Sequence, residues 1–168
     1  MQLTIRPEEA NDAEAIHRLT VDAFLHAPHS GHTEQFIVRE LRRSGALTVS
    51  LVAVLDGRVV GHVAVSPVRI SDGAEGWFGL GPISVSPEHQ REGIGGRLMR
   101  EALDRLRSAS ANGCVVLGDP GYYGRFGFKA IDGLILPGVR VENFQAISFG
   151  SSLPQGVVSY HEAFNARE

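Results

Sequence analysis

The amino-acid sequence predicts an α+β fold with a mixed, mostly antiparallel central sheet flanked by helices. Three features predict it: a β-hairpin pattern in the first half, a strand–helix–strand unit after it, and two helical patterns before it. Short turns join antiparallel strands, whereas a helix crossover joins parallel ones. With 168 residues, 43% of them hydrophobic, we expect a single domain over residues 1–168.

The N-terminal part is expected to form a short strand and two helices. The alternating run QLTIRP predicts the strand. Asn11 and Glu14 have the spacing of a capping box, which predicts that a helix begins there. Thr33 begins a second pattern, which predicts a short helix that ends near Gly45.

The hairpin pattern consists of two β-rich runs, LTVSLVAVL and RVVGHVAVSPVRI. Asp56 and Gly57 join them, and this dipeptide favours the two-residue turn whose twist matches paired strands. The two runs are therefore predicted to pair antiparallel.

The strand–helix–strand unit begins with WFGLGPISV, in which Gly81 and Pro82 predict a bulge or a lost ladder hydrogen bond. A helical pattern follows over residues 94–111, and CVVLGD then reads as a short buried strand. A right-handed crossover would make the two strands parallel neighbours.

Composition excludes several classes of function. The net charge is −3, and no cluster of lysine or arginine with aromatic residues indicates nucleic-acid binding. No apolar run approaches about 18 residues and the N-terminus lacks a signal-peptide pattern, so we expect a cytoplasmic protein without a membrane span. The single cysteine, Cys114, is expected to be a buried and inert strand residue.

The segment SVSPEHQREGIGG, residues 84–96, joins the bulged strand to the helix. A helix N-terminus offers unpaired N–H groups and partial positive charge, and glycines let a phosphate approach the backbone. Three arginines stand around the same turn: Arg91, Arg97 and Arg100. The segment therefore predicts a diphosphate site, but it does not fit GxGxxG, because Leu98 stands where a glycine is needed, and GxxxxGK[ST] occurs nowhere in the chain.

Gln90, Gly93 and Gly95 fill the pattern [Q/R]xxGx[G/A] after a strand. This segment closely resembles the acetyl-CoA pyrophosphate loop of the GNAT superfamily of N-acetyltransferases. IRPEEANDAEAI, DGRVVGHVAVSPV and YGRFGF resemble further parts of that fold, so the resemblance covers roughly residues 3 to 130. GDPGYYGRFGFKA also resembles a subgroup of small bacterial members of mostly unassigned substrate.

The resemblance implies that the parallel βαβ unit splays to bind acyl-CoA, with WFGLGPISV separating from CVVLGD. The cofactor-binding residues it implies are Ile83 and Val85 for the pantetheine arm and Gln90, Arg91, Gly93, Ile94, Gly95 and Gly96 for the pyrophosphate. Acetyl-CoA would be the co-substrate.

The resemblance also implies a catalytic tyrosine. Tyr123 stands where the family places its general acid, and its ordinary pKa near 10 would keep it protonated. Tyr122 is the rival, and an aromatic cluster with Phe126 and Phe128 is the alternative without a catalytic role.

The general base is harder to assign, because WFGLGPISV has no acid where many relatives carry a glutamate. The candidates are Glu34, His26, His29 and His32, and water could serve instead. A proline and a glycine between the histidines prevent a regular helical face, so no metal site is expected.

Two further polar residues are interpreted as structural. His62 lies inside a β-rich run, where a hydrogen-bonded sheet residue is the first interpretation. Asp119 precedes Pro120 and Gly121 and predicts a turn, although many relatives have an asparagine there.

Together these features predict an acetyl-CoA-dependent N-acetyltransferase that moves acetyl by direct attack of a primary amine on the thioester. The acceptor, a small molecule or a peptide, is left open, and its pocket is expected between residues 25–36 and the tail from Gly133 onward. The alternatives are a non-catalytic acyl-CoA-binding or sensing module, and transfer to another acceptor or of a longer acyl group. The tail is expected to supply the last two strands, and strand addition there could give a homodimer.

Overall fold

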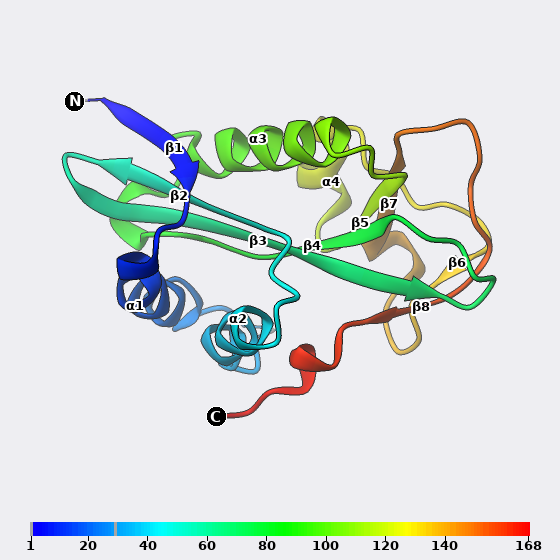
Figure 1. Cartoon of the computed structure of the whole chain (residues 1–168), viewed down its shortest axis with the longest axis horizontal. Helices are drawn as coiled ribbons and strands as arrows, with labels where there is room; N and C mark the ends of the chain where they lie inside the picture. The colour runs from blue at the N-terminus through cyan, green and yellow to red at the C-terminus, as the bar shows by residue number, and fades with distance from the viewer. Residues whose placement is uncertain (1, 29) are drawn as a thin grey trace.

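The computed structural model describes residues 2–28 and 30–168. Within them an eight-stranded sheet has the main order β1-β2-β3-β4-β5-β7, with β8 paired to β3 and to β6 (Figure 1). The strands are β1 (Leu3–Pro7), β2 (Val49–Leu55), β3 (Arg58–Ile70), β4 (Trp77–Val85), β5 (Gly113–Leu117), β6 (Leu134–Ile135), β7 (Phe144–Ser148) and β8 (Gly156–Tyr160).

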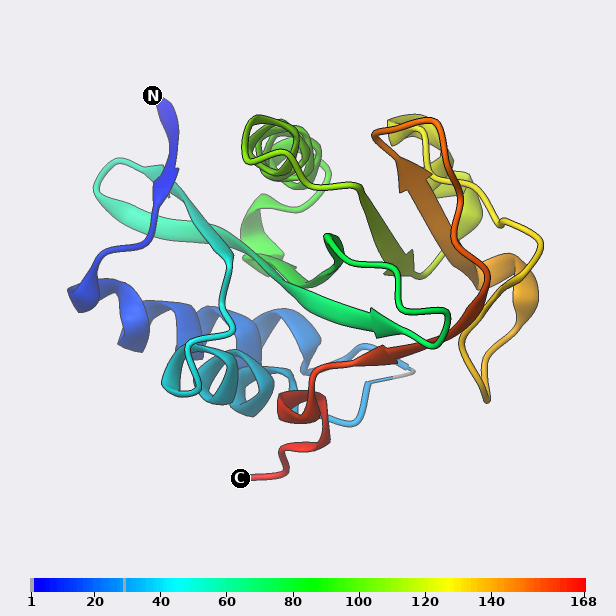
Figure 2. The ribbon, with the colours of Figure 1, turned by 45° about the vertical axis from the view of Figure 1, so that its right-hand side comes forward.

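Helices cover both faces of the sheet. Helices α1 (Ala13–Phe24) and α2 (Glu34–Arg43) lie on one face, and α3 (Ile94–Ser108) lies on the other (Figure 2). Alternation along the strands explains both layers, because Leu51 packs in the cluster of α3 while Val52 packs with Ile16 of α1. The short helix α4 (Pro120–Tyr123) follows β5.

The N-terminal helix begins differently from the prediction. The capping box is formed by Glu9 and Asp12 at the 3₁₀ turn η1 (Ala10–Asp12), not by Asn11 and Glu14. The Asp12 carboxylate accepts from the Glu9 amide at 2.6 Å and from the Arg6 guanidinium at 2.7 Å. Arg6, from the preceding strand, therefore helps to decide which residue caps the turn.

The central hairpin is confirmed. Strands β2 and β3 pair antiparallel, and both turn residues have the positive φ of a two-residue hairpin turn, 50° at Asp56 and 78° at Gly57.

The predicted break in β4 is also confirmed. Its register with β3 shifts so that Val65 pairs with Leu80 whereas Val63 pairs with Ile83, which leaves Gly81 and Pro82 as the irregular residues. Pro82 has no N–H to donate, and Gly81 has a φ of 140°, which residues other than glycine rarely adopt.

Strands β4 and β5 are parallel neighbours only over a short length. The last paired residues are Gly79 and Val115, and β4 then continues to Val85 without a pairing to β5. Because β3 occupies only one side of this stretch, the other side of β4 is an open strand edge beside the bulge.

The tail returns to the sheet and to the helices below it. Strand β7 pairs antiparallel with β5, and β8 pairs with β3, as expected for the last strands. The 3₁₀ turn η5 (Glu162–Asn165) packs on α2, where Ala163 joins the cluster of Ile37 and Leu41. Over the described residues, none of the helices has the length and apolar character needed to cross a membrane.

Candidate active site

The loop between β4 and α3 makes two left-handed turns of the backbone before the helix begins. Arg91 has a φ of 67° and Gly93, the N-cap of α3, has a φ of 85°. No side chain caps the helix, so its first N–H groups are free for a ligand. When residues before a helix adopt the left-handed conformation, successive N–H groups point toward one concave surface that suits an anion.

This loop and α4 enclose one pocket of about 380 Å³, which we call the phosphate pocket. Seven of the eight predicted cofactor-binding residues line it, and Ile83 is the exception. Its lining is Val85, His89, Gln90, Arg91, Gly93, Ile94, Gly95, Gly96, Arg100, Tyr122, Arg125 and Phe126. The size is in the range of small-ligand sites.

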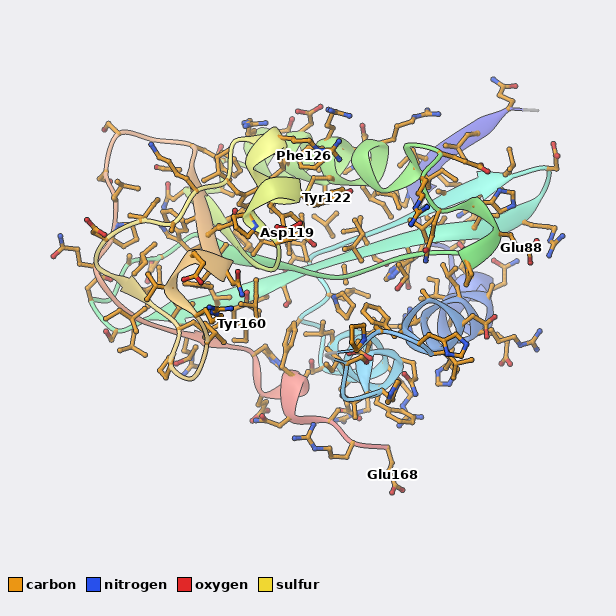
Figure 3. All side chains as sticks on the ribbon, turned by 180° about the vertical axis from the view of Figure 1, so that it is seen from behind. Glu88, Asp119, Tyr122, Phe126, Tyr160 and Glu168 are labelled. Carbon is orange, nitrogen blue, oxygen red and sulfur yellow. The ribbon has the colours of Figure 1, made fainter. Side chains whose placement is uncertain are left out.

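Glycines at the start of α3 let two aromatic residues approach the loop. A Cβ atom on Gly95 would lie 3.0 Å from the hydroxyl oxygen of Tyr122, and one on Gly96 would lie 3.6 Å from Cζ of Phe126. Figure 3 shows both aromatic side chains beside α3. The glycines therefore allow the two aromatic side chains to close the pocket.

Two arginines give the pocket positive charge. The Arg125 guanidinium lies 4.8 Å from the ring centre of Tyr122, and that of Arg100 lies 5.0 Å from the ring centre of Phe126. Stacking on a ring holds a guanidinium in place while its N–H groups remain available to an anion. Sequence analysis missed Arg125 and Phe126 as pocket residues, although both lie in the YGRFGF segment, while Arg97 does not line the pocket.

Tyr123 lies behind the phosphate pocket. Its ring packs edge-on against Tyr122 and Phe128, and it borders the core under α3. A Cβ atom on Gly118 would clash with the Tyr123 ring, so glycine is needed directly after β5. Burial raises the pKa of the Tyr123 hydroxyl to about 12, so the phenol is protonated at neutral pH.

Gln90 and Asp119 have local structural partners. The Gln90 side chain donates to the Val85 carbonyl at 3.2 Å, which ties the loop back to the end of β4. Asp119 is the N-cap of α4 and accepts from the Gly121 amide at 3.0 Å, as the turn interpretation predicts.

Of the predicted base candidates, the three that the structure describes are Glu34, His26 and His32, and they share no hydrogen bond or ion pair with one another. The Glu34 carboxylate accepts from the Ser30 hydroxyl at 2.7 and 2.8 Å, and His26 and His32 are exposed. His29 lies outside the described residues. No group of metal-ligating side chains occurs within the part of the chain that the structure describes.

A buried polar chain lies on the other face of the sheet, under α1 and α2. The Arg42 guanidinium binds both oxygens of Glu8 at 2.8 and 2.9 Å, and the Ser50 hydroxyl donates to the same carboxylate. Ser50 in turn lies 2.8 Å from Nε2 of His62. His62 is fully buried, and burial lowers its pKa to about 4, so the imidazole is neutral at neutral pH.

Cys114 is fully buried, and burial raises the pKa of its thiol. A neutral buried thiol is inert, as its strand position predicts.

Comparisons with known proteins agree with this geometry. Residues 4–131 match the family model of the GNAT acetyltransferase domain. The chain is 36% identical to YhbS, an uncharacterized N-acetyltransferase of Escherichia coli K12, over 97% of this chain and 99% of the relative. It is also 29% identical to the uncharacterized N-acetyltransferase YjhQ of the same organism, over 77% of this chain and 71% of YjhQ.

Two solved structures are similar over nearly the whole chain. A GNAT family acetyltransferase from Brucella melitensis in complex with acetyl-CoA is 50% identical, with a TM-score of 0.88 over 97% of this chain and 98% of that one. E. coli YhbS in complex with CoA is 34% identical, with a TM-score of 0.89 over 99% and 93%. The splayed strands, the phosphate pocket and these matches together identify the chain as a member of the GNAT family of acetyltransferases.

Proposed function

We propose that the chain is a single-domain N-acetyltransferase that moves acetyl from acetyl-CoA to a primary amine by direct attack. The observation that carries the proposal is the phosphate pocket, which lies beside the open edge of β4. One diphosphate ester with an extended arm would fill both features at once. The acetyl-CoA complex of the Brucella relative supports acetyl-CoA as that ligand.

The open edge of β4 can bind the pantetheine arm through its backbone. The Ser86 amide donates to Val60 of β3 at 2.8 Å. Because alternate residues of an antiparallel strand bond to the same neighbour, the N–H and C=O groups of Ile83 and Val85 point to the side that β5 has left. Amide groups of the arm could pair with them as a neighbouring strand would, and an N–H there could also polarise the thioester carbonyl.

The pyrophosphate would be bound by the amides of Arg91, Gly93, Ile94, Gly95 and Gly96. These residues lie at the left-handed turns and the free N-terminus of α3. The guanidinium groups of Arg100 and Arg125 add charge to the same pocket, which compensates locally for the net charge of −3.

Tyr123 is the proposed acid for the leaving thiolate. A thiol has an ordinary pKa of about 8.5, so a phenol with a pKa of about 12 gives up its proton only to a thiolate held in contact. The tyrosine would thus stay protonated until the C–S bond breaks. The acceptor amine, the cytoplasmic location and a homodimer stay predictions.

Titration calorimetry with acetyl-CoA tests the cofactor site without knowledge of the acceptor. One-to-one binding, competed by CoA, is expected. Release of free thiol with a panel of primary amines would then establish transfer, whereas binding with no thiol release for any amine would favour a non-catalytic acyl-CoA-binding module. Failure to bind at millimolar acetyl-CoA would reject the proposal.

A further inference from the structure

Two buried polar atoms without a hydrogen-bond partner belong to directly paired residues of β3 and β4. In the described part of the chain, Nδ1 of His62 and the hydroxyl oxygen of Ser84 both lack a partner, although the two residues are only 0% and 2% exposed. His62 pairs directly with Ser84, so their side chains lie on the same face, with Cβ atoms about 5 Å apart. Unpartnered buried polar groups require a water or a ligand.

The hydrogen bonds on the other side of His62 determine its tautomer. Glu8 is a carboxylate whose pKa is lowered by the hydrogen bonds that it accepts from Arg42 and Ser50, against the opposing effect of burial. The Ser50 hydroxyl must therefore donate its proton to Glu8, and its oxygen accepts from Nε2–H of His62. His62 thus carries its proton on Nε2 and presents a lone pair at Nδ1, away from Ser50.

His62 lies on β3, which pairs with the bulged strand β4. Ser84 follows Ile83, the first residue of β4 to regain its pairing with β3 after the bulge, on the stretch that β5 has left open. The proposed acetyl-transfer site lies along this same stretch. Strand β4 itself carries no acidic or basic side chain.

We propose that Ser84 and His62 form a proton route that holds the proton released in the acetyl-transfer site until Tyr123 is reprotonated, with Glu8 and Ser50 as positioning residues that hold the imidazole. This inference rests on the proposed function. Because both atoms are shielded from solvent and are not hydrogen-bonded to each other, bound water carries the proton of the attacking amine to Ser84 and a proton from its hydroxyl to Nδ1 of His62.

The proton balance of the step is complete. The amine nitrogen forms a bond to the acetyl carbon, the C–S bond breaks, and the thiolate takes a proton from Tyr123. The excess proton of the new amide nitrogen goes through Ser84 to His62. From the imidazolium it returns by the same hydroxyl to rebuild the Tyr123 phenol through solvent, so the enzyme ends unchanged.

The charges around His62 limit what the route can do. Glu8 and Asp12 favour the imidazolium, whereas burial and Arg42 oppose it. Neither α1 nor β4 adds a further charged group that acts on His62. Such a weak base cannot remove a proton from a free alkylammonium ion, whose pKa is about 10. The route therefore acts on the more acidic nitrogen formed by attack, and the acceptor must arrive as the neutral amine.

The kinetic test compares two buried serines. Ser84→Ala removes the route, and Ser66→Ala is the matched control, because Ser66 is also buried and unpartnered on the same face of β3 but pairs with Gly79, on the other side of the bulge. With acetyl-CoA and the best amine of the panel, we expect Ser84→Ala to lower kcat at saturating amine about tenfold to a hundredfold. Ser66→Ala should stay within about twofold of the parent.

The shape of the pH profile separates a proton route from mere packing. In the parent, kcat should be flat between pH 7 and 9. In Ser84→Ala it should rise with pH, because hydroxide then takes the proton. Two results for Ser84→Ala would overturn the route while leaving acetyl transfer intact. One is a kcat equal to that of the parent at every pH, and the other is a lower kcat that stays as flat with pH as in the parent. A parent that binds acetyl-CoA but acetylates no amine overturns the proposed function and the route together.

The tautomer can be tested without any acceptor. Two-bond proton–nitrogen correlation spectra of the full chain labelled with ¹⁵N-histidine should show His62 protonated at Nε2 only. Its signal is identified as the one missing in His62→Gln. A proton on Nδ1 would overturn the proposal whatever the kinetics show.

Discussion

The phosphate pocket and the buried polar chain lie on opposite faces of the same strands, and they are built in different ways. The pocket consists mainly of consecutive residues of one loop, closed by α4, and it offers backbone N–H groups and arginines. The polar chain takes Glu8, Arg42, Ser50 and His62 from separate elements, and it runs from a partly exposed guanidinium to a fully buried imidazole that pairs with Ser84.

The difference fits the ligand that we propose for each region. A diphosphate carries permanent charge, so a solvated loop with free amides and arginines stacked on aromatic rings can bind it. A proton acceptor must instead have one defined tautomer and one free lone pair, which only a fixed set of hydrogen bonds provides. We therefore expect changes in the pocket to affect ligand binding and changes in the polar chain to affect pH dependence.

The largest effect expected is on stability as a function of pH. The pKa of His62 is about 4 in the folded chain, whereas its ordinary value is 6.5. Between these two pH values the unfolded chain therefore binds a proton at His62 and the folded chain does not. The contribution of the neutral, buried His62 to the free energy of unfolding is fully present above pH 6.5 and is lost as the pH falls toward 4. It amounts to about 3 kcal/mol of the free energy of unfolding.

Urea unfolding at pH 7.0, 5.5 and 4.5 measures this loss. The lowered pKa values of Glu8, Glu40 and Asp12 begin to reduce stability near their ordinary values of 4.5, 4.5 and 3.8, so the decline between pH 7.0 and 5.5 reports on His62 and the further decline to pH 4.5 only mostly so. His62→Gln should lack that part of the decline. A parent with the same free energy of unfolding at pH 7.0 and 4.5 would refute the burial of a neutral histidine.

The next effect is on the phosphate pocket. Gly95→Val places a side chain against the Tyr122 hydroxyl and in the space for the phosphate. We expect the Kd of acetyl-CoA to rise about a hundredfold, which corresponds to about 2.7 kcal/mol. Gly124→Ala is the control, because Gly124 has an ordinary helical φ of −57° and no atom within 4 Å of its Cβ position.

Both Kd values are measured by calorimetry. Equal Kd values for Gly95→Val and the parent would mean that the pyrophosphate binds elsewhere, even if the chain binds acetyl-CoA.

The smallest effect should separate the two adjacent tyrosines. Tyr123→Phe should lower kcat about ten- to thirtyfold with nearly unchanged acetyl-CoA affinity, because it removes only the acid for the thiolate. Tyr122→Phe should instead raise the Kd by a few-fold, because its hydroxyl borders Gly95 in the phosphate pocket.

Thiol-release kinetics and calorimetry on both variants make the comparison. If the loss of kcat follows Tyr122→Phe and spares Tyr123→Phe, the roles of the two tyrosines are reversed and the general acid has been assigned to the wrong residue.

Elements governed by short-range chemistry were predictable from the sequence. Asp56 and Gly57 determine a hairpin turn, and Gly81 with Pro82 interrupts the ladder, because both pairs act through the φ angles and N–H groups of their own residues. The phosphate pocket was largely predictable for the same reason, since Gln90 to Gly96 are consecutive. The capping box was predicted wrongly because Arg6, on another element, bonds to Asp12.

Local sequence patterns were thus sufficient to predict the mixed sheet, its bulge and the glycine-rich loop before α3. Tertiary packing was needed to place Tyr122, rather than Tyr123, in the lining of the pocket, and to put His62 between Ser50 and Ser84. The physical reason is that strand register and helix packing bring together residues as far apart as Glu8 and Ser84. No local pattern carries that information, because each of these residues alone is an ordinary polar side chain in an ordinary strand or turn.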